Sequence, residues 1–276
     1  MNPTINQPEF KLKDGNRIPA LGLGTLELTG EKCIEVVKKS LQLGYKHIDT
    51  AEAYGNQKEI GKGIKNFDRK KLFITSKIWM ENLHHDDVFK SCEKTLKELK
   101  TDYLDLYLIH WPNRNIPLEE TFKALEELAK EGKIKSIGVS NFTINHLKDA
   151  LKVAGMLITV NQVEFHPYLY QKDLLEFCNQ NKIVLTAYSP LGRGSLIKDE
   201  VIREISAKYK KTPAQVCLRW ELERGVVVIP KASSESHLKE NLGIFGWKLS
   251  NEDIERIDSI NSNKRFVNPT FGDFNY

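Results

Sequence analysis

Short apolar segments recur along the chain, and between them lie longer stretches in which apolar residues return every three or four positions. The short segments are rich in β-branched residues and predict buried strands. There are eight of them: 20–25, 47–51, 72–79, 104–111, 134–140, 158–165, 183–189 and 226–231. The longer stretches predict amphipathic helices at 32–43, 87–99, 118–133, 143–154, 172–181 and 212–225. The pattern is clearest in 118–133, where Phe122, Leu125 and Leu128 share one face and Gly132 marks the end.

This alternation of strand and helix predicts a parallel sheet covered by helices. Strands that are apolar along nearly their whole length favour a (β/α)₈ barrel, the TIM barrel fold, in the α/β class. Ahead of the barrel, two short segments flank Asp14, Gly15 and Asn16 and predict a β-hairpin cap. The stretches 198–211 and 251–261 predict two extra helices. Because no linker or low-complexity segment divides the chain, we expect a single domain spanning 1–276.

Composition narrows the class of protein. The chain has 276 residues and a mass of 31.7 kDa, and 40% of its residues are hydrophobic against 28% charged. No apolar stretch is long enough to span a bilayer, so we expect a soluble protein with no membrane partner. The first residues lack the pattern of a secretory signal, and the four cysteines are widely spaced without a C-x-x-C motif. Reduced thiols and a cytoplasmic location are therefore expected.

Charge and histidine content exclude two further classes. The net charge is +4, but lysines alternate with acidic residues through most helical stretches, as on a solvated face. Nucleic acid is therefore not an expected partner. The run from His84 to Asp87 contains two histidines and two aspartates, yet neighbouring residues on one loop rarely converge on one ion. We expect no metal site.

Polar residues stand where several of the predicted strands end. In a barrel of this kind the loops that follow the strands form the active face. Asp49 lies near the end of the second strand, Lys77 near the end of the third and His110 near the end of the fourth. Tyr54 lies in the loop after the second strand. Each residue taken singly also fits a structural role, but four of them on three successive strand ends favour catalysis.

The buried lysine suggests what this group of residues does. Desolvating an ammonium costs several kcal/mol unless an anion compensates, and Asp49 is the expected partner of Lys77. A lysine that also faces Tyr54 would favour the phenolate and lower the tyrosine's pKa from about 10 toward the working pH. Tyr54 would then be a general acid, and His110 could hold the oxygen that receives the proton.

Several motifs in this sequence resemble those of the aldo-keto reductases. They are GLGT, HIDTAEAYGNQKEIG, ITSKIW, DLYLIHWP, GVSNF, NQVEFHPY, AYSPLGRG and VVVIPK with the later KEN. They occur in order from about residue 10 to residue 265. The segment 111–120 leaves little room for a long loop, so the chain is most similar to the prokaryotic 2,5-diketo-gluconate and glyoxal reductases.

The resemblance implies NADPH-dependent reduction of aldehydes, ketones or α-dicarbonyls by a monomer. It implies that Asp49, Tyr54, Lys77 and His110 form the catalytic tetrad. It also implies cofactor contacts, which would come from Gly24, Thr25, Asp49, Ser140, Asn141, Gln162, Tyr188, Ser189, Leu191, Glu240 and Asn241. In the family Ser140, Asn141 and Gln162 would bind the nicotinamide carboxamide, Tyr188 would stack on the ring, and the loop 189–195 would cover the pyrophosphate.

The phosphate of the adenosine half is expected after the last two strands. The segment GLGTLE lacks the third glycine of a Rossmann motif, so a Rossmann pyrophosphate site is not expected there. Lys231 ends the eighth strand, and Ser233 or Ser234 can cap the helix that follows, which leaves amide hydrogens for a phosphate.

Two residues at this site differ from the family. Ala232 stands where the family has serine or threonine, and His237 stands where it has arginine. NADP is expected because Lys231 is present, while use of NAD remains possible.

A mostly apolar pocket is expected around the carbonyl of the substrate. The residues predicted to form it are Leu26, Trp79, His110 and Trp111. The aromatic segment 265–276 either closes this pocket or packs on the barrel. Two other functions stay open: a cofactor-binding regulatory barrel with little turnover, and a lyase that forms a Schiff base at Lys77.

Overall fold

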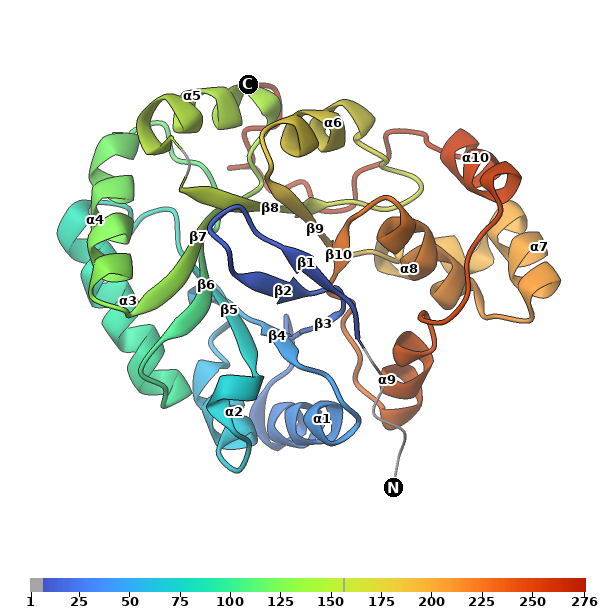
Figure 1. The fold of residues 1–276 in the computed structure, drawn as a ribbon, viewed down its shortest axis with the longest axis horizontal. Helices are drawn as coiled ribbons and strands as arrows, with labels where there is room; N and C mark the ends of the chain where they lie inside the picture. The colour runs from blue at the N-terminus through green and yellow to red at the C-terminus, as the bar shows by residue number, and fades with distance from the viewer. Residues whose placement is uncertain (1–6, 156) are drawn as a thin grey trace.

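Eight parallel strands form a barrel in the structure, a computed structural model that describes residues 7–155 and 157–276 (Figure 1). The strands are β3 (Gly22–Gly24), β4 (His47–Asp49), β5 (Phe73–Ile78), β6 (Leu104–Ile109), β7 (Ile134–Ser140), β8 (Ile158–Glu164), β9 (Val184–Tyr188) and β10 (Val227–Val228). Strands that are consecutive in sequence are neighbours in the sheet. Parallel bridges from Leu21 to Val228 and from Gly24 to Lys231 join the first strand to the last. The (β/α)₈ barrel predicted from the sequence is confirmed.

Helices cover the outside of the barrel (Figure 1). They are α1 (Gly30–Gln42), α2 (Gln57–Ile64), α3 (His85–Leu99), α4 (Leu118–Lys130), α5 (Ile144–Ala154), α6 (Lys172–Gln180), α7 (Glu200–Tyr209), α8 (Pro213–Glu223), α9 (Glu235–Leu242) and α10 (Asn251–Ser259). The predicted extra helices are α7 and α10, which pack against each other. Residues 1–6 and 156 of the expected single domain lie outside the described residues.

Helix α2 is the element that the sequence pattern did not predict. It is only eight residues long and contains two glycines, which are poor helix formers. The structure shows why glycine is needed. A Cβ on Gly61 would lie 2.5 Å from the carbonyl oxygen of Glu98, and one on Gly63 would lie 2.7 Å from a methyl group of Val37. The glycines lower helix propensity but allow α2 to pack closely against α1 and α3.

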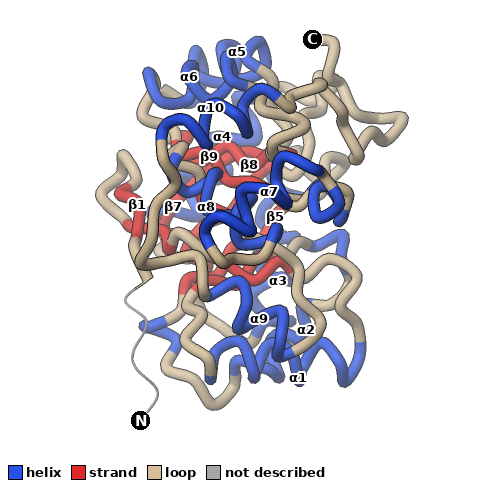
Figure 2. Tube along the Cα trace, turned by 90° about the vertical axis from the view of Figure 1, so that its right-hand side faces the viewer, coloured by secondary structure: helices blue, strands red, loops and turns tan. Residues whose placement is uncertain are grey.

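The predicted hairpin closes one end of the barrel. Strand β1 (Glu9–Lys11) pairs antiparallel with β2 (Arg17–Pro19), and Gly15 takes the left-handed conformation in the turn with φ of +96°. Leu12 and Ile18 pack in one cluster with barrel residues that include Phe73 and Leu106. Figure 2 shows the hairpin and the C-terminal segment at opposite ends of the barrel.

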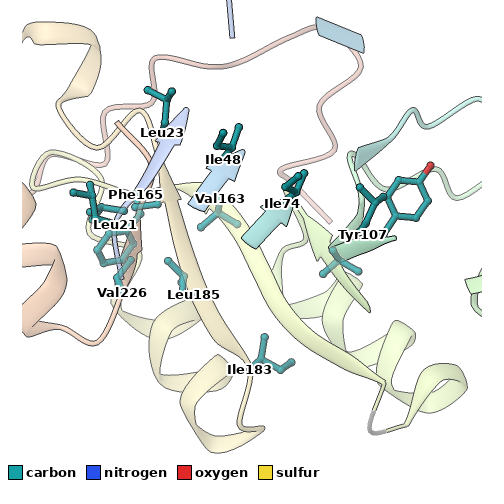
Figure 3. Close-up of a cluster of buried hydrophobic side chains, with 14 of the residues drawn as sticks. Leu21, Leu23, Ile48, Ile74, Tyr107, Val163, Phe165, Ile183, Leu185 and Val226 are labelled. Atoms are coloured by element: carbon teal, nitrogen blue, oxygen red, sulfur yellow. The ribbon is translucent and has the colours of Figure 1, made fainter. Parts of the chain in front are cut away.

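The period of two along each strand decides which residues enter the barrel. Leu23, Ile48 and Ile74 occupy paired positions on neighbouring strands and belong to the main hydrophobic cluster (Figure 3). Asp49 follows Ile48 directly, so it has the opposite orientation. Lys77 lies three positions after Ile74 and is likewise turned to the other side. Both residues are buried.

Two observations on the described residues concern membrane spans and thiol chemistry. None of the helices in 7–155 and 157–276 is long and apolar enough to cross a membrane. All four cysteines are buried and free. Burial raises the pKa of the Cys33 thiol to about 11, so the reactive thiolate is disfavoured there.

Glu221 on α8 is a buried carboxyl group outside the active face. Its side chain is 0% exposed, and neither carboxyl oxygen has a hydrogen-bond partner among the described residues. Burial raises the pKa of Glu221 well above its ordinary value. The folded protein therefore holds this group protonated at a pH where the unfolded chain has lost the proton.

Glu221→Gln should stabilise the protein, and increasingly so as the pH rises. Below the ordinary glutamate pKa both states bind the proton and the penalty is absent; above it, folding must take up a proton, and stability falls until the folded-state pKa is reached. At pH 8 we expect a gain of about 1–3 kcal/mol. Urea unfolding of both proteins at pH 5 and pH 8 measures it. An equal difference at the two pH values would contradict a raised pKa.

Candidate active site

Lys77 is the centre of the polar residues inside the barrel. Its ammonium lies 2.6 Å from Oδ1 of Asp49 and 2.8 Å from the main-chain oxygen of Thr50. The hydroxyl of Tyr54 is 3.3 Å away. The lysine side chain is 0% exposed, so all three contacts are made without water. The structure brings Asp49, Tyr54 and Lys77 together as the sequence predicted.

The ion pair is held in its charged form by mutual contacts. Desolvation acts to lower the pKa of Lys77, but the charges of Asp49 and Tyr54 and their hydrogen bonds outweigh it, so the pKa lies above its ordinary value. Burial acts to raise the pKa of Asp49, and Lys77 opposes this. Gln162 also donates to the second carboxylate oxygen, at 2.7 Å. Both oxygens of the carboxylate are thus bonded, as an ionised buried group requires.

Tyr54 differs from the sequence expectation. Burial raises the pKa of the Tyr54 phenol above its ordinary value, and the Lys77 ammonium opposes this rise without reversing it. The prediction that Lys77 brings this pKa toward neutrality was wrong in direction, because it considered the charge and not the desolvation of the phenolate. The phenol therefore keeps its proton at neutral pH.

His110 lies beside Tyr54 and is uncharged. The two rings meet edge to face with centroids 5.7 Å apart, and Trp79 contacts the imidazole in the same way at 5.4 Å. Burial, together with the nearby charge of Lys77, lowers the pKa of His110 well below its ordinary value. Its Nδ1 atom is buried and has no hydrogen-bond partner among the described residues. His110 is thus a neutral polar group between Tyr54 and Trp79.

The residues expected to bind a nicotinamide carboxamide form one network at the ends of β7, β8 and β9. The Tyr188 hydroxyl donates to Oδ1 of Asn141 at 2.7 Å, and the Ser140 hydroxyl donates to the main-chain oxygen of Gln162 at 2.8 Å. Asn141 also donates to the main-chain oxygen of His110. Because Gln162 bonds Asp49, this network is joined directly to the group formed by Asp49, Lys77 and Tyr54.

The loop after β9 and the end of β3 border the same region. Ser189 and Arg193 both have left-handed backbone conformations, and Leu191 is partly buried against the core. Thr25 is buried and donates from its hydroxyl to the main-chain oxygen of Asp49. Gly24 lies against β10: a Cβ there would be 2.5 Å from the carbonyl oxygen of Ile229. Only glycine permits this approach of the two strands.

At the expected phosphate site, Ser234 and not Ser233 caps α9, accepting from the amide of His237. Lys231 forms an ion pair with Glu27, which lies in the loop after β3. Ala232 is buried in the core, so its methyl group does not face the solvent side of the site. The remaining expected residues differ in exposure: Ser233 and His237 are exposed, Glu240 is half-buried and Asn241 is buried.

An aromatic group surrounds the place expected for the substrate. The ring of Phe271 meets Trp79 edge to face at 5.5 Å and Trp111 at 5.3 Å. Phe274 contacts Trp111 at 5.6 Å. Leu26, on the loop after β3, is an exposed apolar side chain. Of the two placements left open for the segment 265–276, the structure shows the one that covers the tryptophans.

The histidine pair of α3 takes part in surface contacts. His84 lies 3.1 Å from a carboxylate oxygen of Glu120, and His85 contacts Asp86 and Glu127, each at 3.0 Å. In the described ranges 7–155 and 157–276 no three histidine, cysteine, aspartate or glutamate side chains are grouped so that they could hold a metal ion.

The model of the aldo/keto reductase family matches residues 20–262, which include every strand of the barrel. The chain belongs to the aldo/keto reductase family. Within this family it is 46% identical to a glyoxal reductase of Bacillus subtilis over 266 residues, covering 95% of this chain and 96% of that one. It is 40% identical to the methylglyoxal reductase DkgA of Escherichia coli over 269 residues, covering 96% of each.

Comparison of structures agrees with the family assignment. A solved structure provisionally named 2,5-diketo-D-gluconic acid reductase B has a TM-score of 0.93 and 36% sequence identity, covering 98% of this chain and 97% of that one. The predicted likeness to prokaryotic glyoxal and diketo-gluconate reductases is confirmed. As an aldo/keto reductase, the protein is an oxidoreductase that acts on carbonyl compounds.

Sequence reasoning missed three residues of this aldo/keto reductase site. Glu52 accepts from the amide of Trp79 and from Asn82, and so fixes the start of the loop after β5. Glu27 pairs with Lys231, and Phe271 contacts both tryptophans. Glu52 lies within a family motif and could have been noticed as a carboxylate two positions before Tyr54. For Glu27 and Phe271 the sequence carries no signal of the partner, which is distant in the chain.

Lys77→Met should destabilise the fold because it leaves the Asp49 carboxylate buried without its cation. Breaking a buried pair from one side costs about 3–5 kcal/mol. The double variant Asp49→Asn with Lys77→Met removes both charges and should recover part of this loss. Urea denaturation of the two variants beside the parent tests the coupling. If the double variant is less stable than Lys77→Met, the two residues are not an ion pair in solution.

Proposed function

We propose that this protein reduces small aldehydes and α-dicarbonyls to alcohols with NADPH, and that Tyr54 is the proton donor. The observation that carries the proposal is the position of the Lys77 ammonium, enclosed between the Asp49 carboxylate at 2.6 Å and the Tyr54 hydroxyl at 3.3 Å. The family membership and the glyoxal and methylglyoxal reductases among its relatives support the class of substrate.

The chain's own residues account for the proton. Because burial keeps the Tyr54 phenol protonated, the hydroxyl has a proton to donate to a carbonyl oxygen. Loss of that proton creates a phenolate next to an ammonium, and the charge of Lys77 stabilises it. Asp49 keeps Lys77 protonated. Neutral His110 can hydrogen-bond the substrate oxygen without competing as a base.

The polar residues at the ends of β7 to β9 fit a nicotinamide cofactor. A primary amide needs donors and acceptors together, and Ser140, Asn141 and Gln162 supply both. Tyr188 offers an aromatic surface beside them, and its hydroxyl is fixed by Asn141. When bound, such a cofactor supplies the hydride for the carbonyl carbon. The bond from Gln162 to Asp49 links the residues that would orient the cofactor to those that tune the acid.

At the expected site for the 2′-phosphate of NADPH, Lys231 supplies a cation and the capped N-terminus of α9 supplies amide hydrogens. Glu27 competes for the same ammonium. Its pKa is lowered by the hydrogen bond and charge of Lys231, with Arg193 adding to the effect, so the carboxylate is ionised at neutral pH. We therefore propose a preference for NADPH over NADH that Glu27 weakens.

The lyase alternative is disfavoured by the state of Lys77. A Schiff base requires a free amine as the nucleophile. The pKa of Lys77 lies above its ordinary value, because the nearby anions outweigh desolvation, and the amine stays protonated. A regulatory barrel would bind the cofactor through the same residues but would not need a proton donor. Only a measurement of turnover therefore distinguishes it from a reductase.

Tyr54→Phe should abolish most turnover while the protein stays folded. Loss of a positioned general acid lowers the rate by about 10²–10⁴-fold. Within 7–155 and 157–276 the only side-chain hydrogen bond to this hydroxyl comes from Lys77, so NADPH binding should change little. Methylglyoxal-dependent loss of NADPH absorbance measures turnover, and fluorescence quenching measures cofactor affinity. Tyr103→Phe, which removes a half-buried hydroxyl outside the site, is the matched control. Near-normal turnover by Tyr54→Phe would show that Tyr54 is not the proton donor, whereas a folded, NADPH-binding parent without turnover would favour the regulatory barrel.

Glu27→Gln should strengthen NADPH binding and leave NADH binding nearly unchanged. Exposed ion pairs contribute up to about 1 kcal/mol, so we expect up to about a fivefold lower Kd for NADPH, with the difference shrinking in high salt. Equilibrium fluorescence titration with both cofactors measures this. Glu31→Gln, at an exposed position on α1, controls for net charge. An equal change for both cofactors would show that Lys231 does not face the 2′-phosphate.

A further inference from the structure

Glu164 is a second buried carboxylate on the active face, and it makes no contact with the tetrad. It is the last residue of β8, two positions after Gln162, and its side chain is 0% exposed. Burying an ionised carboxylate costs several kcal/mol unless hydrogen bonds compensate. Glu221 is the contrasting case, because neither of its carboxyl oxygens has a hydrogen-bond partner among the described residues. The partners of Glu164 therefore indicate what this residue does.

After α10 the chain returns to the barrel, and two of its main-chain amides there donate hydrogen bonds to the carboxylate of Glu164. The amide of Phe266 donates to Oε1 at 2.8 Å, and the amide of Val267 donates to Oε2 at 2.9 Å. His166 contacts Oε1 through Nε2 at 3.0 Å. Burial works against the ionised form, but these hydrogen bonds outweigh it and hold the pKa of Glu164 below its ordinary value. Both carboxylate oxygens thus hold Phe266 and Val267, near the start of the C-terminal segment 265–276; this start is called the root of the segment.

That segment, residues 265–276, is called the tail below, and it leads directly to the substrate pocket. Phe271 lies five residues after Phe266 and contacts Trp79 and Trp111. Its ring is 43% exposed, so the core does not hold it in place. The guanidinium of Arg265 lies 3.8 Å from the ring of Phe274, which is the other tail residue against Trp111. The position of both rings therefore depends on how the tail is attached.

The far end of the tail is attached to α5 and the loop before α4. Asp273 lies 3.3 Å from Arg114 and 3.3 Å from Nε2 of His146. The Tyr276 hydroxyl contacts Asp149 at 2.5 Å. Arg114 is mostly exposed, and pairs of this kind contribute little in water. The far end also contains buried contacts, since His146 is buried and the Thr143 hydroxyl donates to the main-chain oxygen of Tyr276 at 2.8 Å. The tail is thus attached at two places, of which the one at Glu164 holds its first residues.

The root of the tail also borders the loop expected to cover the cofactor pyrophosphate. Gly192 in that loop has a φ of +52°, and a Cβ there would lie 3.1 Å from the ring of Phe266. The same ring lies 5.5 Å from His166. Glu164 thus fixes Phe266 at the point where the cofactor loop and the tail meet.

We infer that Glu164 is a positioning residue for substrate binding: it holds the root of the tail so that Phe271 and Phe274 complete the wall formed by Trp79 and Trp111. This inference rests on the proposed carbonyl reductase function. It assigns the tail a selective effect. An aromatic aldehyde is long enough to contact the tail rings, whereas a three-carbon dicarbonyl is held mainly by the groups around Tyr54.

Glu164→Gln tests this, because an amide presents one acceptor oxygen and one donor nitrogen to two N–H donors. One tail amide therefore loses its acceptor. We expect the KM for benzaldehyde to rise about tenfold, with the KM for methylglyoxal within about twofold and kcat for both nearly unchanged. Glu221→Gln is the matched control, since it makes the same exchange at a buried carboxylate that does not contact the tail. It should leave both KM values unchanged.

A measurement that needs no turnover follows the attachment itself. Hydrogen exchange of the tail peptide, read by mass spectrometry without substrate, should be at least about tenfold faster in Glu164→Gln and unchanged in Glu221→Gln. Phe271→Ala, at an exposed position, should raise the KM for benzaldehyde without changing exchange at Phe266 and Val267. In the double variant Phe271→Ala with Glu164→Gln, the KM for benzaldehyde should rise little beyond its value in either single variant, because both changes remove the same wall of the substrate site.

The outcomes separate the inference from the proposed function. Unchanged exchange in folded Glu164→Gln overturns the inference, and so does an equal rise in KM for both aldehydes. If Glu164→Gln does not fold, an unchanged benzaldehyde KM in Phe271→Ala overturns it. If the parent turns over neither aldehyde, the reductase function fails and the substrate role of Glu164 fails with it. In that case the exchange result still shows whether the carboxylate holds the tail.

Discussion

The buried ion pair between Lys77 and Asp49 is the interaction on which the site depends. A fully desolvated ammonium is tolerated only because a carboxylate, a carbonyl oxygen and a phenol surround it. Those partners come from β4 and the loop that follows it, so the pair fixes β4 against β5. Asp49 extends the arrangement through Gln162 to β8 across the barrel. The residues proposed for catalysis and those proposed for the cofactor thus share one hydrogen-bonded structure.

The charge of Lys77 and burial together set the protonation of the neighbouring side chains. Burial and the Lys77 charge act together on the histidines, and the pKa of His47 is lowered to about 3 while that of His110 is also well below its ordinary value. On Tyr54 the two effects oppose each other, and burial is the larger. The site therefore combines neutral imidazoles with a protonated phenol, which is the state that a proton donor requires before reaction.

The two ends of the barrel serve different purposes. At one end the hairpin residues Leu12 and Ile18 fill the opening with apolar side chains. The C-terminal segment lies at the other end (Figure 2), where polar residues follow the strands and the rings of Phe271 and Phe274 contact Trp79 and Trp111. Glu164 and Glu221 show the contrast on a smaller scale. Both are buried carboxyl groups, but the first is an ionised carboxylate that accepts from three hydrogen-bond donors, two of them main-chain amides of the C-terminal segment, while the second is protonated and has no hydrogen-bond partner among the described residues.

The sequence by itself determined the barrel and the hairpin, and it placed Asp49, Tyr54, Lys77 and His110 close together, because the alternation of strand and helix puts the ends of successive parallel strands on one face. It did not predict α2, since its glycines matter only where α1 and α3 approach. It also gave the wrong direction for the pKa of Tyr54, because desolvation depends on everything that surrounds a group. The pairing of Glu27 with Lys231 and the attachment of the tail at Glu164 join residues that are about one hundred or more positions apart. Such contacts are decided only when the barrel closes and brings the ends of its strands together.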